Sequence, residues 1–274
     1  DLSVTVKFEL KDEPNTFLLA WTTTPWTLPG NMALAVGEDI DYVIAKHENN
    51  NYIVAIERIE DVFKDKEFEI EKEIKGKDLA GKNYKPLFPY YDNADLENKE
   101  NAFKIYSADF VNTEDGTGIV HIAPAFGEDD YSLSKQENIP FVQHVHMDGT
   151  FKREVIDFAG IFVKHQDEPA SEEHSEEEVE ATDVKIIKYL AKKDLLFSKE
   201  KFEHSYPHCW RCDSPLLNYS TSSWFVAVEK IKKDLLKNAT KIEWMPEHIK
   251  DGRFGQWLEG ARDWSISRQR FWGS

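Results

Sequence analysis

The chain has 274 residues, of which 41% are hydrophobic, and a formal net charge of −17 at pH 7. Eight Trp and seventeen Phe provide enough apolar bulk for a real core, in one large domain or two ordinary ones. The acidic balance argues against a dedicated nucleic-acid-binding module, and no apolar run approaches the ~20 residues that span a bilayer.

The N-terminus and the cysteines indicate the compartment. The chain starts without a basic region followed by an apolar one, so we expect no signal peptide. It also starts without Met, so we expect a fragment of a longer protein. Cys209 and Cys212 lie too close together to staple a domain of this size, which indicates a reducing compartment. We therefore expect a cytoplasmic, monomeric fragment without a membrane partner.

Short strand-like runs, separated by turn residues, dominate the first part of the chain. In residues 3–10, Val4, Val6, Phe8 and Leu10 alternate with other residues, which is typical of a half-buried strand. Further strands are expected at residues 17–22, 42–46, 52–56, 102–106, 118–123 and 160–163. Many short strands with few helical periods predict a mixed α/β fold dominated by β structure, an antiparallel or mixed β-barrel with peripheral helices.

Residues 166–183 contain nine acidic residues and no Lys or Arg. We predict a solvated, mobile insertion there, with a partner-binding segment as the alternative. After it the apolar period changes to three or four residues, which predicts amphipathic helices at 183–196 and 224–238. We place the domain boundary so that residues 1–205 form one domain with its insertion and residues 206–274 form a helical connector.

The most informative local motif runs from Trp21 to Asn31, with the sequence Trp-Thr-Thr-Thr-Pro-Trp-Thr-Leu-Pro-Gly-Asn. Its threonines are Thr22, Thr23, Thr24 and Thr27. Two prolines remove N–H donors and force the chain out of any sheet, so a rigid peptide presents hydroxyls and backbone groups that can grip a small polar ligand or a water. Threonine as an ordinary strand residue, ended by proline, explains the same pattern without a function.

The second dense motif covers residues 115–131, Asp-Gly-Thr-Gly-Ile-Val-His-Ile-Ala-Pro-Ala-Phe-Gly-Glu-Asp-Asp-Tyr. Its first two glycines allow a tight turn, and residues 119–123 should form a buried strand that directs His121 to one face. Three acids that include Asp130 follow where a helix should begin, at its positive end. A satisfied core histidine and ordinary helix-capping acids would also explain the segment.

Both motifs resemble the editing domain of isoleucyl-tRNA synthetases. The first is similar to their threonine-rich peptide, and Pro25-Trp26 stands where valyl and leucyl relatives typically carry Arg-Pro, which favours the isoleucyl branch. The second is similar to the family segment Gly-Thr-Gly-x-Val-His-x-Ala-Pro-x-x-Gly-x-x-Asp-Tyr. Ala125-Phe126 replaces a Gly-His pair common in many bacterial members, which looks more like the eukaryotic-type branch.

The resemblance implies a role for each matching residue. Asp130 would clamp the cationic α-amino group of the amino acid to be removed, while His121 and Thr27 would shape the side-chain pocket. The catalytic peptide of Thr22, Thr23 and Thr24 would hold the terminal adenosine ester and the attacking water. Further substrate-binding candidates are Trp21, Trp26, Asn31, Phe126 and Asp148. Asp148 belongs to a segment similar to the family's Asp-Gly-x-Phe ending, and it is also a simple turn signal.

The Cys-x-x-Cys pair, Cys209 and Cys212, has two histidines nearby, but a zinc site normally needs two separated ligand pairs. We therefore expect no metal, with zinc at this pair as the minor alternative. The segment around Cys209 and Cys212 and residues 262–274 resemble the family segments that lead from the editing domain back into the Rossmann catalytic core. The adenylate-forming signatures His-x-Gly-His and Lys-Met-Ser-Lys-Ser do not occur in the 274 residues. ATP is expected only in a catalytic domain outside this sequence, and editing needs no cofactor.

The resemblance thus implies an aminoacyl-tRNA deacylase within an isoleucine–tRNA ligase. Its substrates would be the 3′ end of valyl-tRNA(Ile) and also valyl-adenylate, and its partner would be the rest of the parent synthetase. Two alternatives stay open. One is a non-catalytic module that binds an aminoacyl-nucleotide, which a deacylation assay separates from the enzyme. The other is a valyl-type editing domain, against which Pro25-Trp26 speaks.

Overall fold

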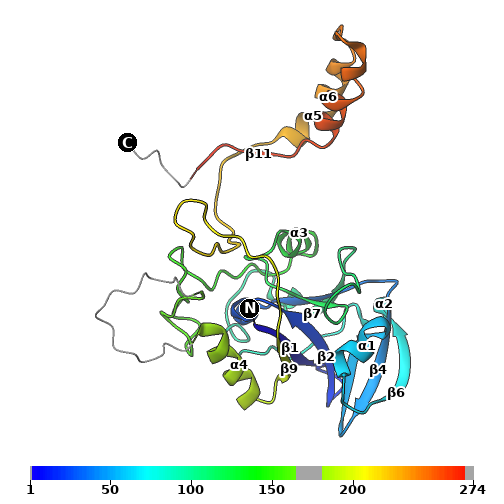
Figure 1. The fold of residues 1–274 in the computed structure, drawn as a ribbon, viewed down its shortest axis with the longest axis vertical. Coiled ribbons are helices and arrows are strands. Elements are labelled where there is room, and N and C mark those ends of the chain that lie inside the picture. Colours follow the sequence, from blue (N-terminus) through cyan, green and yellow to red (C-terminus); the bar gives the residue numbers. More distant parts are fainter. Residues whose placement is uncertain (1, 165–180, 269–274) are drawn as a thin grey trace. The chain divides into compact units, whose positions relative to one another are not determined.

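The computed structural model describes residues 2–164 and 181–268, and Figure 1 shows their fold. The chain forms two compact units, Asp1–Ser220 and Thr221–Ser274. Most of the predicted acidic insertion, residues 166–180, lies outside the described residues. Within the described part of the chain, no helix is long and apolar enough to cross a membrane.

A six-stranded sheet forms the base of the first unit, with the strand order β6-β4-β5-β2-β1-β9. Its strands are β1 (Leu2–Glu9), β2 (Thr16–Thr22), β4 (Asp41–His47), β5 (Asn50–Ala55), β6 (Glu69–Lys75) and β9 (Leu196–Lys201). All neighbours are antiparallel except β2 and β5, which are parallel. The predicted strand is confirmed as β1, with Val4, Val6 and Phe8 in the main core, but the expectation that this strand is half-buried is wrong. The other face is also buried, and Lys7 reaches Asp194 there with an Nζ–Oδ1 distance of 2.8 Å.

A second sheet of three strands has the order β7-β3-β8. Its strands are β3 (Ala33–Val36), β7 (Lys104–Ser107) and β8 (Ile119–Ile122). The central strand β3 is fully buried, and the register places Leu34 opposite His121 on β8. Strands β2 and β8 come from different sheets and pack against each other, so the ends of the two predicted motifs meet.

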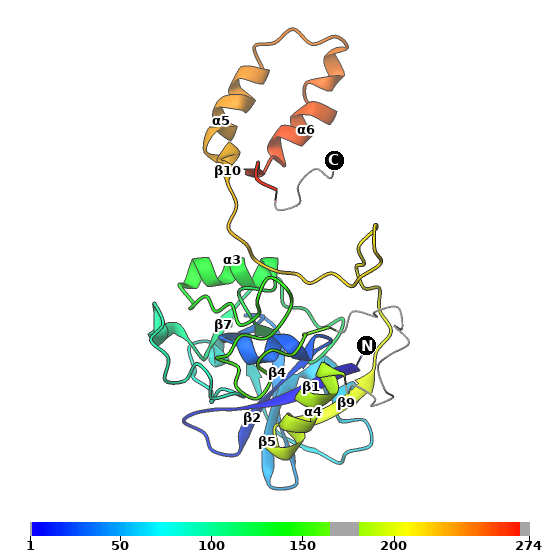
Figure 2. The same ribbon diagram turned by 90° about the vertical axis from the view of Figure 1, so that its left-hand side faces the viewer.

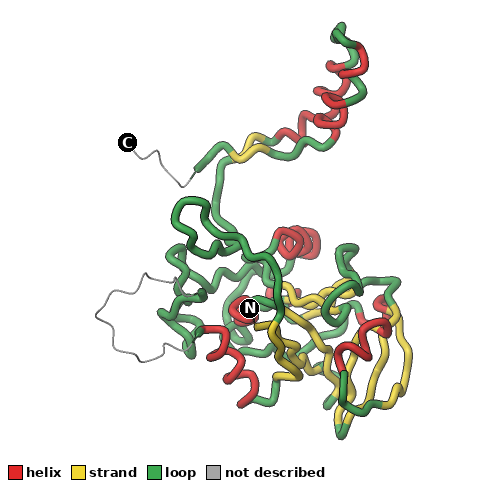
Figure 3. The backbone as a smooth tube through the Cα atoms, viewed as in Figure 1, coloured by secondary structure: helices red, strands yellow, loops and turns green. Residues whose placement is uncertain are grey.

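Short helices surround these sheets, as Figure 3 shows in red. They are η1 (Pro25–Gly30), η2 (Ile56–Arg58), α1 (Ile59–Phe63), α2 (Gly76–Leu79), η3 (Lys99–Asn101), α3 (Glu128–Glu137) and α4 (Thr182–Lys192). The predicted helix at 183–196 is too long at its C-terminal end. Asp194 has a left-handed φ of 57°, which turns the chain from α4 into β9.

The mixed α/β character is confirmed, but the expected barrel is not, because the sheets are open in the described residues. Strands β6 and β9 are the two edges of the large sheet and do not pair with each other. The strand expected at 160–163 is reduced to one isolated bridge, between Thr150 and Phe162. Gly160 has a φ of +77°, a turn conformation that ends regular pairing there.

The second unit is a helical pair with a two-stranded ribbon (Figure 2). It contains β10 (Phe225–Val226), α5 (Val228–Ala239), η4 (Glu247–Ile249), α6 (Arg253–Glu259) and β11 (Trp264–Ser265). The helix expected at 224–238 begins later, because residues 225–226 pair with β11. The first unit extends to Ser220, whose backbone N donates to Ala125 O at 2.9 Å. The boundary at residue 206 stays a prediction about the organisation of the parent protein.

Candidate active site

One cavity of about 410 Å³ brings the two predicted motifs together. The sequence-predicted residues that line it are Trp21, Thr22, Thr23, Thr24, Thr27, His121, Phe126 and Asp130. The two segments come from the end of β2 and from β8 with the start of α3. Their closest link is a 2.8 Å contact between Thr27 Oγ1 and His121 Nε2, which lie 94 positions apart in the chain.

The threonine peptide is held by its own hydrogen bonds. Strand β2 ends at Thr22, and Pro25 starts the 3-10 helix η1, because its fixed φ suits the first helical position. Thr24 N donates to Thr22 Oγ1 at 3.1 Å, and Thr27 Oγ1 donates to Thr24 O at 2.9 Å. The Thr23 side chain lines the cavity and makes no hydrogen bond to any described residue. The peptide therefore presents a preformed row of hydroxyls to the cavity.

His121 is neutral, and both of its ring nitrogens have hydrogen-bond partners. Burial, with a smaller contribution from His144, lowers the pKa of His121 to about 4, so the ring carries no charge at pH 7. Its Nε2 contacts Thr27 Oγ1, and its Nδ1 lies 3.4 Å from Asn31 Nδ2. A histidine with both nitrogens engaged is a fixed wall of the cavity and has no nitrogen left to activate a water.

Asp130 is placed by the start of α3. It is the third residue of that helix, and its Oδ2 accepts a hydrogen bond of 2.7 Å from Ala123 N. Burial raises the pKa of Asp130 to about 6, against the lowering effect of the Ala123 hydrogen bond. A carboxylate oxygen also packs on Gly127, where an added Cβ would lie 2.8 Å from Asp130 Oδ1. Glycine at this position leaves room for the carboxylate beside the cavity.

The lining is acidic. Glu114 and Asp115 join Asp130 on the wall, and none of the described residues that line the cavity is Lys or Arg. Such a wall favours a cationic group, and an α-ammonium is the small cation that a single carboxylate binds with charge-assisted hydrogen bonds. The same charge disfavours a polyanion next to it.

Three predicted residues are not on the cavity wall. Trp26 is buried behind it, with its ring 5.2 Å from that of Phe126, so it supports a lining residue. Asn31 is also buried and contacts His121 from behind. Asp148 lies in an exposed turn, where its Oδ1 accepts from Thr150 N at 2.9 Å. The Asp148 side chain thus stabilises a turn, which is the alternative role that the sequence also indicated.

Several residues that line the cavity were not predicted from the sequence. They are Phe110, Asn112, Glu114, Asp115, Gly116, Thr117, Gly118, Ile119, Val120, Ala123 and Gly127. Many of these belong to the second motif, and their place in the cavity could have been inferred from the backbone that carries His121. Phe110 and Asn112 follow β7 and had no distinguishing local signal. Tyr84, which bonds to Asn31, was missed as well.

Cys209 and Cys212 lie on a short turn, where Cys209 N donates to Ser214 O and Asp213 N donates to Cys209 O. They form no disulfide. In the described ranges, no group of three or more His, Cys, Asp or Glu side chains is arranged to hold a metal ion. The expectation about zinc at this pair stays a prediction.

Comparison with known proteins identifies relatives along the whole chain. The isoleucine–tRNA ligase of Bdellovibrio bacteriovorus is 48% identical over 279 residues, covering 100% of this chain and 24% of that protein. The Bacillus thuringiensis ligase is 47% identical with the same coverage, and the Treponema denticola ligase is 48% identical over 95% of this chain. The chain thus spans about a quarter of the length of the curated relatives it matches. These relatives are bacterial, and they leave the eukaryotic-type branch a prediction.

Among solved structures, similarity is weaker. The crystal structure of GlLeuRS-CP1 is 22% identical with a TM-score of 0.41, over 49% of this chain and 59% of that one. The P. knowlesi cytosolic leucyl-tRNA synthetase editing domain is 14% identical with a TM-score of 0.39, over 50% of this chain and 64% of that one. At these scores the family assignment rests on sequence. The family model for tRNA synthetases class I (I, L, M and V) matches residues 46–274, and the chain therefore belongs to this family.

Proposed function

We propose that this chain is the editing domain of an isoleucine–tRNA ligase and that its cavity hydrolyses the ester of valyl-tRNA(Ile), and also valyl-adenylate. The observation that carries the proposal is the convergence of the threonine peptide and Asp130 on one cavity. One ester must offer its ribose and carbonyl oxygens to hydroxyls and its α-ammonium to a carboxylate, and this cavity has both.

The chemistry needs positioning more than strong reagents. An aminoacyl ester is already activated, so a water held in line and dipoles aimed at the developing oxyanion lower the barrier. Thr22, Thr23 and Thr24 supply hydroxyls and backbone groups for the adenosine ester and the water. Asp130 anchors the α-ammonium, which fixes the ester carbonyl relative to the hydroxyls.

Valine is the amino acid that such a site must remove. A binding pocket gains only about 1–3 kcal/mol from one methylene, a limit for which isoleucine–tRNA ligases are themselves the usual example. A second, smaller pocket completes the discrimination if isoleucine cannot enter it. The buried pair of His121 and Thr27 forms a packed wall that sets this size limit.

The rest of the proposal concerns the parent protein. ATP would bind only in its catalytic part, outside these residues, and the partners of the chain would be that part and the 3′ end of tRNA(Ile). We propose a cytoplasmic protein and a monomeric fragment. Zinc at Cys209 and Cys212 is the minor alternative, and editing would not depend on it.

The test is the deacylation of valyl-tRNA(Ile) by the full-length protein and its Asp130→Asn variant. A charge-assisted hydrogen bond contributes about 1.5–3 kcal/mol, so we expect a loss of roughly 10- to 100-fold. Asp129→Asn, an exposed neighbour on α3, is the matched control and should keep most of the activity. Isoleucine-dependent ATP–pyrophosphate exchange should be unchanged in both variants.

Three results would contradict the proposal. Binding of a valyl-adenosine analogue without turnover of valyl-tRNA(Ile) would make the chain a non-catalytic binding module. Equal rates for wild type and Asp130→Asn would show that the Asp130 charge has no role in deacylation. Preferential deacylation of threonyl-tRNA(Val) would indicate the valyl-type alternative.

A further inference from the structure

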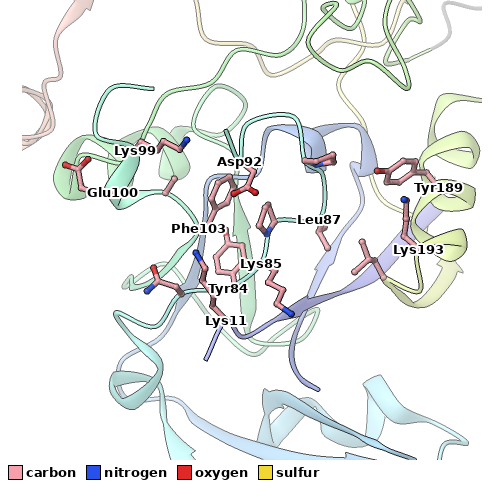
Figure 4. Close-up of a pocket in the computed structure, with 15 residues that line it drawn as sticks. Lys11, Tyr84, Lys85, Leu87, Asp92, Lys99, Glu100, Phe103, Tyr189 and Lys193 are labelled. Carbon is pink, nitrogen blue, oxygen red and sulfur yellow. The ribbon is translucent and has the colours of Figure 1, made fainter. Parts of the chain in front are cut away.

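Tyr84 is a buried residue that no sequence motif singled out. Its ring packs edge-on against Phe8 at a centroid distance of 5.2 Å and against Phe103 at 6.1 Å. It lies at the wall of a second cavity, lined also by Lys85 and Leu87 (Figure 4). Its hydroxyl is engaged within the fold, since it donates to Asn31 Oδ1 at 2.6 Å. Burial raises the pKa of Tyr84 well above its usual value, so the hydroxyl keeps its proton.

The orientation of the Asn31 amide follows from its partners. Asn31 Nδ2 lies 2.8 Å from the carbonyl oxygen of Ala33, which can only accept a hydrogen bond. The NH2 group must therefore face Ala33, and the amide oxygen faces the Tyr84 hydroxyl, which donates to it. The second hydrogen of Nδ2 is directed at His121 Nδ1, 3.4 Å away.

This orientation determines the tautomer of His121. A neutral imidazole has one N–H and one bare nitrogen, and Nδ1 must be the bare one because Asn31 donates to it. Nε2 therefore carries the hydrogen and donates to Thr27 Oγ1 at 2.8 Å. The Thr27 hydroxyl can then give its single hydrogen to Thr24 O, at 2.9 Å. The hydrogen bonds that link Tyr84, Asn31, His121, Thr27 and Thr24 O thus form a relay, in which every donor lies on the Tyr84 side of its acceptor.

We propose that Tyr84 is a positioning residue for the cavity. Through Asn31, Tyr84 holds His121 as the Nε2–H tautomer and so orients the Thr27 hydroxyl. Its effect on discrimination rests on the proposed function, whereas the tautomer assignment does not. Without the tyrosine hydroxyl, the buried oxygen of Asn31 loses its donor, and only the bond from Nδ2 to Ala33 O still favours the present orientation of the amide. The wall formed by His121 and Thr27 then becomes less rigid, although neither residue has changed.

The experiment measures the tautomer directly, by the ¹⁵N chemical shifts of the His121 ring in the full chain at pH 7. The variants are Tyr84→Phe, Asn31→Ala and the double variant. Tyr106→Phe is the matched control, because its hydroxyl also donates to an oxygen of the fold, Asn101 O at 2.8 Å, but lies outside the relay. We expect only the Nε2–H form in wild type and in Tyr106→Phe, and a mixture of tautomers in Tyr84→Phe.

The second readout is the ratio of valyl- to isoleucyl-tRNA(Ile) deacylation by the full-length protein. Tyr84→Phe should lower this ratio about tenfold, as expected for one unsatisfied buried polar group, and should add nothing in the Asn31→Ala background. An Nδ1–H or doubly protonated His121 in wild type overturns the proposal even if every variant is unstable. An unchanged tautomer in Tyr84→Phe overturns it as well. If wild type shows the Nε2–H form but deacylates neither ester, the proposed function fails and the tautomer assignment stands.

Discussion

The partly buried carboxylate of Asp130 should destabilise the fold at neutral pH, and Asp130→Asn should remove this cost. Burial is the main reason that the pKa of Asp130 is raised from 3.8 to about 6. Between about pH 4 and pH 6 the folded state therefore binds more protons than the unfolded state. Stability that is present below pH 4 is lost as the pH rises through 6. A rise in pKa from 3.8 to about 6 corresponds to ~3 kcal/mol. This is an upper bound for the free energy of unfolding that Asp130→Asn gains over wild type at pH 7.5, relative to the same comparison at pH 4.

The assay is amide hydrogen exchange of β3, whose fully buried residues report the unfolding of the first unit. Wild type and Asp130→Asn are compared at matched pH, so that the intrinsic exchange rate cancels. Asp109→Asn, which changes an exposed carboxylate, is the control. Its free energy of opening should differ from that of wild type by the same amount at both pH values. The free energy of opening in Asp130→Asn should exceed that of wild type by about 1–3 kcal/mol at pH 7.5, and by much less at pH 4. A difference that is the same at both pH values would refute the reasoning.

Three further outcomes are expected. Deacylation of valyl-tRNA(Ile) by wild type should fall about tenfold from pH 7 to pH 5, because Asp130 loses its charge over this range, and initial rates across it check the prediction. His121→Ala should deacylate isoleucyl-tRNA(Ile), which wild type is expected to spare; parallel single-turnover assays measure this, and sparing by the variant as well would mean that His121 is not the wall. Gly127→Ala should reduce deacylation at least tenfold, because its Cβ would meet the Asp130 carboxylate at 2.8 Å; an unchanged rate would show that the carboxylate has room to shift.

Some of the site could be predicted from local sequence. Prolines that end a strand act within a few residues, so the kinked threonine peptide is recognisable from its own residues. The acids at 128–130 likewise mark the start of α3, since carboxylates are favoured at the positive end of a helix. The alternation in β1 was sufficient to place Val4, Val6 and Phe8 in the core. The helix boundaries were less certain, because a positive φ at Asp194 and the pairing of β10 with β11 ended or delayed the helical pattern.

The sequence alone thus determined which side chains the two motifs offer, the family to which they are similar and the approximate position of most strands, because these depend on neighbouring residues. Only the tertiary structure decided that the sheets stay open and that Thr27 and His121, 94 positions apart, touch. It also decided that Trp26 and Asn31 stand behind the cavity, and that Tyr84 bonds to Asn31. Strand order, burial and the pKa of Asp130 come from contacts between distant segments, and no local pattern in the chain encodes which distant partner each residue will meet.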